Sequence, residues 1–289
     1  MKSLYDVPAP AKLNLFLHIT GRRSDGYHLL QSAFMLIDWC DTLHFELRAD
    51  GKITREDLTA PLPADDLIVK AAQALQQFSA TPLGAHISVA KSIPAQAGMG
   101  GGSSDAASCL LALNRMWKLN LPLSLLMSLG LKLGADVPFF LHGHYAWVEG
   151  IGEKMQPLNI PKAQFAVVKP VAGLATNAIF SDPALKRDAE TAIISGFAVY
   201  PFDFGRNDLQ PVAQTLCPEV TTALEWLSNQ GLRPRMTGSG SAVFAKIADG
   251  VNLDFETVPK DAVVKVCNNL SNHPLAGWAA QWGKVSVRK

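Results

Sequence analysis

Hydrophobic and polar residues alternate along the first part of the chain. Between Ala9 and Ile19, every second residue from Leu13 onward is a large aliphatic, and the positions between them are mixed in type. This period of two predicts a strand with one buried face and one mixed face. Lys12 and Asn14 then lie side by side on the mixed face, where they suit an oxyanion. An ordinary half-exposed strand is the alternative at this point.

Other segments repeat their apolar residues at helical spacing. Such spacing predicts a helix after Asp65, which we expect to be its N-cap, and further helices over 123–133 and 219–230. Shorter apolar runs predict strands at 34–37, 41–47, 86–90, 164–169 and 242–247. A last helix near 261–269 and a strand near 278–287 complete an α+β pattern. Ile160-Pro161 favours a boundary between two domains, 1–158 and 159–289.

The most informative stretch is the glycine-rich segment 94–104, PAQAGMGGGSS, between a predicted strand and a predicted helix at 105–117. Glycine backbone takes positive φ easily and can turn several N–H groups toward a ligand. Ser103 and Ser104 add hydroxyls where the helix begins, and the free N–H groups of a first turn carry partial positive charge. The segment therefore predicts a phosphate site. A flexible linker fits poorly, because the loop is short and held at both ends.

Two well-known phosphate loops differ from this segment. A Walker loop requires Lys after its last glycine, whereas Gly102 is followed by Ser103. The dinucleotide fingerprint fits better, but the acidic residue it needs about 20 positions later is replaced by residues such as Lys118 and Asn120. A dinucleotide-dependent oxidoreductase stays a second interpretation, and a non-catalytic module that binds anions or RNA a third.

Composition narrows the class of protein. The 289 residues are 48% hydrophobic and 18% charged, which suffices for a large core, and the net charge of +1 gives no basic excess for nucleic acid. The four cysteines are widely separated and indicate neither zinc nor disulfides. We expect a cytoplasmic protein, since no run of about 18 apolar residues and no secretory h-region occurs.

Two polar sites outside the glycine segment invite interpretation. Pro138 disfavours helical geometry at Val137, so Asp136 is expected in a bent loop after a helix that Gly134 ends, either as a turn residue or as a braced base. His142 and His144, in a predicted hairpin, are weak evidence for metal, and the metal ligands stay unknown. A polar turn over 21–28 ends in Tyr27 and His28, either packed or available for stacking on a ligand.

Four motifs in order resemble the GHMP small-molecule kinases, which include galactokinase, homoserine kinase and mevalonate kinase. They are AKLNL at 11–15, the turn GRRSDGYH at 21–28, the segment 94–107, and LGADVPF at 133–139, with MTGSG at 236–240 as further support. The resemblance covers about Ala9 to Phe244. It implies a two-domain α+β fold with the active site in the interdomain cleft, an N-terminal half that carries the glycine loop, and a ferredoxin-like C-terminal half.

The resemblance also implies ATP and Mg²⁺ as cofactors and a role for each motif. Lys12 and Asp136 match the catalytic pair. Tyr27 and Phe180 match aromatics that sandwich a cytosine, His28 bonds its edge, and Asn14 lies near the substrate phosphates or hydroxyls. The ATP cradle is carried over to Lys91, Pro94, Ala95, Gln96, Ala97, Gly98, Met99, Gly100, Gly101, Gly102, Ser103 and Ser104.

Within the family, the turn at Tyr27-His28 favours members that phosphorylate the C2 hydroxyl of a cytidylyl-methylerythritol, with homoserine and mevalonate kinases as alternatives. A monomer or weak homodimer is expected. Two residues depart from the family pattern: Met99 replaces Leu with little change of volume, and Asp66 stands where relatives often carry Asn. An ionised Asp66 cannot donate to adenine. Asp208 is assigned no role.

Overall fold

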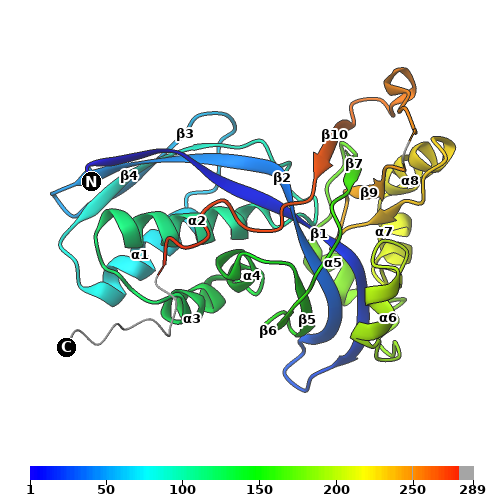
Figure 1. Ribbon diagram of the computed structural model, residues 1–289, viewed down its shortest axis with the longest axis horizontal. Coiled ribbons are helices and arrows are strands. Elements are labelled where there is room, and N and C mark those ends of the chain that lie inside the picture. Colours follow the sequence, from blue (N-terminus) through cyan, green and yellow to red (C-terminus); the bar gives the residue numbers. More distant parts are fainter. Residues whose placement is uncertain (249, 280–289) are drawn as a thin grey trace.

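Two long antiparallel strands, β1 (Ser3–Arg22) and β2 (His28–Arg48), run through both halves of the molecule (Figure 1). The computed structural model describes residues 1–248 and 250–279. Register shifts interrupt the β1–β2 pairing between Pro10 and Lys12 and again between Asn14 and Leu17. Both faces of β1 are buried around these bulges, so the half-exposed face that simple alternation suggested does not occur.

The N-terminal sheet has the order β3-β4-β2-β5-β6, with β1 paired to β2. Its remaining strands are β3 (Ile53–Asp57), β4 (Gly84–Ala90), β5 (Ala146–Gly150) and β6 (Lys154–Pro157). One face is covered by α1 (Leu67–Ser79), α2 (Gly101–Met116), α3 (Leu123–Leu133) and α4 (Val137–His142) (Figure 1). Fully buried side chains such as Phe45, Leu110 and Phe139 fill the core between sheet and helices.

The C-terminal half contains a second antiparallel sheet of order β10-β7-β9-β8. Its strands are β7 (Gln164–Lys169), β8 (Arg235–Met236), β9 (Val243–Lys246) and β10 (Val263–Asn268). The accompanying helices are α5 (Thr176–Ser181), α6 (Ile194–Val199), α7 (Gln210–Leu216), α8 (Pro218–Asn229) and the 3₁₀ turn Phe255–Thr257. Leu17 and Ile19 of β1 belong to this core, so the first strand joins the two halves.

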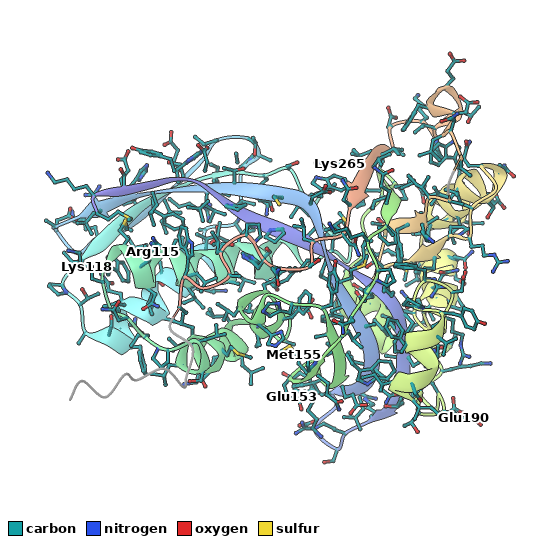
Figure 2. All side chains as sticks on the ribbon, in the orientation of Figure 1. Arg115, Lys118, Glu153, Met155, Glu190 and Lys265 are labelled. Carbon is teal, nitrogen blue, oxygen red and sulfur yellow. The ribbon has the colours of Figure 1, made fainter. Side chains whose placement is uncertain are left out.

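After β10 the chain returns to the N-terminal half (Figure 1). The His273 amide donates to the Gly143 carbonyl over 2.8 Å, and Leu275 packs in the N-terminal core. Arg115, labelled in Figure 2, places its guanidinium carbon 4.6 Å from the centroid of the Trp278 ring. Residues 270–279 thus pack on the N-terminal half, although they follow a strand of the C-terminal half.

Most predicted elements are confirmed, with ends that shift by a few residues. Asp66, not Asp65, caps α1 by accepting from the Val69 amide, and α2 begins inside the glycine segment at Gly101. The two strands expected over 34–47 are one continuous strand, β2. The helix expected near 261–269 is wrong, because valines at 263, 264 and 266 form β10 on β7.

Three further expectations, two near the middle of the chain and one at its end, differ from the structure or lie partly outside the described residues. Val137 is not excluded from helical geometry: it opens α4, since Pro138 sits in the first turn, where a missing N–H costs nothing. His142 ends that helix instead of lying in a hairpin. The sequence also predicts a strand over 278–287. Trp278 and Ala279 lie in a bend, and the other positions of this strand fall outside the described residues.

Candidate active site

A cleft of about 1160 Å³ opens between the two halves. The glycine segment forms one wall, and the second glycine turn, Gly238–Gly240, contributes to the opposite side. The sequence-predicted residues that line it are Lys12, Tyr27, His28, Lys91, Asp136 and Phe180, together with every residue from Pro94 to Ser103. Asn14 and Ser104 do not line the cleft: both are buried, and the Ser104 hydroxyl donates to the Pro10 carbonyl over 2.7 Å.

The glycine segment takes its shape from positive φ and from close packing. Gly98 and Gly100 have φ of 70° and 72°. A Cβ on Gly100 would come within 2.8 Å of the Phe140 ring, whereas one on Gly102 would meet only the Leu67 side chain, at 3.9 Å. The loop is therefore packed against protein at its start and open where α2 begins, which is where N–H groups and the helix dipole favour an anion.

The second glycine turn supports the first from behind. A Cβ on Gly98 would lie 2.3 Å from the Thr237 carbonyl, and one on Gly238 would lie 2.6 Å from the Gly98 carbonyl. The Ser241 amide donates to the Gln96 carbonyl over 3.0 Å. Backbone of the C-terminal half thus contacts backbone of the phosphate loop directly, and only glycine permits that approach.

Lys12 and Asp136 face each other across the cleft floor. The Lys12 Nζ lies 3.4 Å from Asp136 Oδ2, and the lysine side chain is 5% exposed while the aspartate side chain is 31% exposed. The Lys12 amide donates to the Met99 carbonyl over 3.0 Å, so the same residue fixes the strand to the phosphate loop. The Asp136 carboxylate can accept a proton from a hydroxyl bound in the cleft, with the Lys12 ammonium beside it.

Asn14 orients Lys12 instead of lining the cleft. Its Oδ1 accepts from Lys12 Nζ, its Nδ2 donates to Ser32 Oγ over 2.9 Å, and its amide donates to Thr237 Oγ1 over 2.9 Å. The Lys12 Nζ also lies 4.3 Å from the centroid of the Phe34 ring. The ammonium is thus held in one place by groups that leave the Asp136 side open.

An aromatic group lies at the other end of the cleft. The rings of His28 and Phe180 have centroids 5.0 Å apart, and Tyr27 is 60% exposed beside them. Arg187 Nε donates to His28 Nε2 over 2.9 Å and Arg187 Nη2 donates to the Phe180 carbonyl over 3.1 Å. Burial, followed by the charges of Arg187 and Arg22, lowers the pKa of His28, so its neutral ring can donate from Nδ1. Sequence analysis missed Arg187, which no motif marks.

Lys91 is enclosed by carboxylates. Its Nζ donates to Asp41 Oδ2 and to Asp105 Oδ2, and these two side chains are 0% and 2% exposed. Burial would lower the pKa of Lys91, but the two neighbouring carboxyl groups outweigh it and raise the pKa. The expected nucleotide contact of Lys91 therefore competes with two internal partners. No sequence motif marks Asp41, and Asp105 is noted only as part of the segment 94–107.

Asp66 is fully engaged by protein. Its Oδ1 accepts from the Val69 amide over 2.9 Å, and its Oδ2 pairs with Arg55, which also binds Asp57. Because both oxygens accept, the side chain offers no donor to a purine, although the residue lines the cleft. The Asp66 carboxylate is thus paired with Arg55 inside the protein.

Two residues after α6 hold neighbouring backbone: Asn207 holds the second glycine turn, and Asp208 holds β1. Asn207 Nδ2 donates to the carbonyls of Met236 and Gly238, both over 2.8 Å. Asp208 Oδ2 accepts from the Ile19 amide over 2.9 Å, and its other oxygen binds Arg206. Asp208 therefore has a structural place, bonded to the backbone of β1.

The chain belongs to the GHMP kinases. Its residues 66–144 match the profile described as "GHMP kinases N terminal domain", and residues 197–254 match "GHMP kinases C terminal". The chain is 70% identical over 279 residues to the 4-diphosphocytidyl-2-C-methyl-D-erythritol kinase of Albidiferax ferrireducens, with 96% of each chain covered. Within the GHMP kinases, this degree of identity places it in the family of those enzymes.

Solved structures agree with this assignment. A 4-(cytidine 5'-diphospho)-2C-methyl-D-erythritol kinase is similar at a TM-score of 0.74 and 30% identity, over 92% of this chain and 98% of the other. Homoserine kinase from Cytophaga hutchinsonii is similar at a TM-score of 0.71 but only 14% identity, over 94% and 96%. At this low identity, the similarity to homoserine kinase shows the fold alone. In residues 1–248 and 250–279, no helix has the length and apolar character needed to cross a bilayer.

Proposed function

We infer that this chain transfers the γ-phosphoryl group of ATP to the C2 hydroxyl of 4-diphosphocytidyl-2-C-methyl-D-erythritol, which gives the 2-phosphate and ADP in isoprenoid biosynthesis. The relatives and the solved structure named above support the substrate. The observation that carries the site assignment is the Lys12–Asp136 pair, 3.4 Å apart and facing a cleft whose wall is the glycine segment.

ATP fits the wall formed by residues 94–103. Gly102 is open to the cleft, and the N-terminus of α2 presents free N–H groups there. We propose that the triphosphate lies along this wall. Mg²⁺ is part of the proposal, since a hard cation commonly binds through substrate phosphates and water and would offset their charge. ATP use follows from membership of the kinase family.

The reaction requires alignment and one proton transfer. The C2 oxygen forms a bond to the γ-phosphorus while the bond from that phosphorus to the β-bridging oxygen breaks, and the hydroxyl proton passes to Asp136 Oδ2. Lys12 lies beside that carboxylate, where its ammonium can stabilise the charge that develops on the transferring oxygens. Asn14 acts on the substrate through Lys12, because its side chain is bonded to the ammonium.

We propose that the cytosine ring binds at the aromatic end of the cleft. Tyr27 and Phe180 would stack on its faces, and His28 Nδ1 would donate to its edge. Burial, with the charge of Arg187, lowers the pKa of His28 and so favours the neutral form that this contact needs. The domain limits 1–158 and 159–289, a cytoplasmic location and a monomer or weak homodimer stay predictions.

An ADP-release assay tests the function. Wild-type protein, ATP and magnesium are combined in turn with cytidylyl-methylerythritol, homoserine and mevalonate. We expect ADP only with the first acceptor, and we expect Asp136→Asn to release it about 10²- to 10⁴-fold more slowly than wild type. Release with homoserine or mevalonate alone would overturn the substrate, and equal release by Asp136→Asn would overturn the site.

A further inference from the structure

Asp41 and Asp105 lie on either side of Lys91 next to the phosphate loop, and the reaction described above uses neither. Asp41 comes from β2, Lys91 follows β4, and Asp105 stands in the second turn of α2, the helix whose N-terminus faces the cleft. Both carboxyl groups are buried, although Lys91 and Asp105 border the cleft. One ammonium therefore faces two acids beside the place where ATP phosphates bind.

The hydrogen bonds of the two acids are unequal. Asp41 Oδ1 accepts from the amides of Ser92 and Ile93, at 2.5 and 2.8 Å, and its Oδ2 accepts from Lys91. Asp105 Oδ2 accepts from Lys91 alone, and its buried Oδ1 has no partner among the described residues. A carboxylate with three donors is stabilised as an anion, whereas one with a bare buried oxygen is not. Of the two acids, Asp105 is therefore the one whose ionised form is less stabilised by hydrogen bonds.

The charge of Asp105 bears on ATP because of its position. Lys91 and Asp41 together are neutral, so an ionised Asp105 leaves one uncompensated negative charge at the start of α2. This charge would repel the phosphates. It would also interact with the partial positive charge at the N-terminus of α2, which attracts the phosphates. A protonated Asp105 removes the repulsion without moving the loop.

We propose that Asp105 is a positioning residue that takes up a proton when the ATP phosphates bind at the N-terminus of α2, so that ATP binds more tightly below neutral pH than above it. This inference rests on the proposed function, because it assumes that the phosphates occupy residues 98–103. The proton comes from solvent and bonds to Asp105 Oδ1, and no covalent bond of ATP changes in this step.

The surroundings of Asp105 allow both protonation states near neutrality. Burial raises the pKa of Asp105 to about 7 against the opposing charge of Lys91. Cys109, one turn further along α2, stays neutral because burial raises the pKa of its thiol well above the usual range. Among the described residues, the other aspartates and lysines that line the cleft are paired: Asp25 with Arg23, Asp66 with Arg55, and Lys12 with Asp136. Asp41 pairs with Lys91.

The first test measures proton uptake directly on the wild-type protein. ATP binding is followed by titration calorimetry with excess magnesium at pH 6 and pH 8, in buffers of different ionisation enthalpy. If ATP binding is linked to protonation of Asp105, proton uptake should approach one proton per ATP at pH 8. It should be small at pH 6, where Asp105 is already protonated. Absence of uptake at pH 8 would overturn the proposal.

The second test compares the pH dependence of the ATP dissociation constant in two variants. In wild type it should rise by roughly three- to tenfold per unit above pH 7, the limit for one linked proton. Asp105→Asn, which is neutral at every pH, should flatten this slope, and Asp66→Asn, the same change elsewhere in the cleft, should keep it. ATP's own titration is common to all three proteins and cancels.

A wild-type slope in Asp105→Asn would overturn the proposal. If that variant fails to fold, the uptake measurement on wild type decides alone. Both tests use ATP without acceptor, so they are independent of which alcohol is phosphorylated. ATP that binds with proton uptake but yields no ADP would contradict the proposed function only.

Discussion

The two lysines that line the cleft differ in what surrounds them. Lys12 is bonded to the neutral Asn14 and lies 3.4 Å from Asp136, a carboxylate with 31% of its side chain exposed. Lys91 is enclosed by two carboxyl groups, each at most 2% exposed. A lysine whose carboxylate partner is partly exposed can act on a substrate. A lysine enclosed by two buried carboxyl groups instead holds strands, loop and helix together.

The largest effect is expected from Asp136→Ala. Loss of the general base should lower kcat by about 10²- to 10⁴-fold. The melting temperature should stay close to that of wild type, because the side chain lies partly in solvent. Steady-state kinetics and thermal unfolding measure the two. Asp65→Ala, an exposed carboxylate outside the cleft, is the control, and an unchanged kcat in Asp136→Ala would remove it from the role of base.

Lys91→Met should show the opposite pattern, with stability as the main loss. Removing the ammonium leaves two buried acids without a counter-ion, which costs about 3–5 kcal/mol when one partner of a buried pair is deleted. Urea unfolding measures this change. Lys70→Met, which breaks the exposed pair with Asp65, should cost no more than about 1 kcal/mol. Equal losses in the two variants would show that the enclosed cluster has no special structural role.

Tyr27→Ala should separate the two substrates. Base stacking contributes about 1–3 kcal/mol, so KM for the cytidylyl substrate should rise roughly 5- to 150-fold while KM for ATP stays constant. Tyr5→Ala is a matched control, because Tyr5 is 59% exposed and lies outside the cleft, against 60% for Tyr27. Parallel increases in both KM values would exclude Tyr27 from the cytosine site.

The smallest effect concerns the pH dependence of stability. Burial lowers the pKa of His273 to about 4, so between pH 4 and roughly 6.5 the unfolded chain binds the extra proton and stability rises with pH. Asp105 acts in the reverse sense: its raised pKa makes the folded state bind the proton below about 7, so stability falls as pH rises.

Thermal unfolding across pH 4 to 7 tests both signs. His273→Gln should make the rise of melting temperature with pH shallower, and Asp105→Asn should make it steeper. The charge state of other groups is common to the variants, so the differences from wild type isolate each residue. Slopes that change in the same direction would contradict the assignment of one of them.

The local part of the site could be predicted from the sequence, because its signals are contiguous. The glycine segment carries its own conformational requirement, and Gly98 and Gly100 take the positive φ that glycine allows. The pairing of Lys12 with Asp136 required the family resemblance, since simple alternation left Lys12 on an ordinary strand. The bulges in β1 and its packing against the C-terminal half together bury that strand. The alternation of residue types in the sequence reveals neither of these features.

Contacts between distant segments could not be predicted. Asp41 is 50 residues from Lys91, and Arg187 is 159 residues from His28. Such pairs depend on the register of whole sheets and not on local pattern. The error at β10 has a similar origin, since a short apolar run near 261–269 becomes a strand only because β7 offers it an edge.

The close approach of Gly98 and Gly238 has a consequence for how the chain can be divided. The phosphate loop and both proposed catalytic side chains lie within residues 1–158, yet the backbone on which the loop rests belongs to residues 237–241. A fragment that ends before the second sheet would carry the full set of reactive groups without the surface that shapes them. Division of the chain at residue 158 would therefore separate the glycine segment from the backbone that supports it.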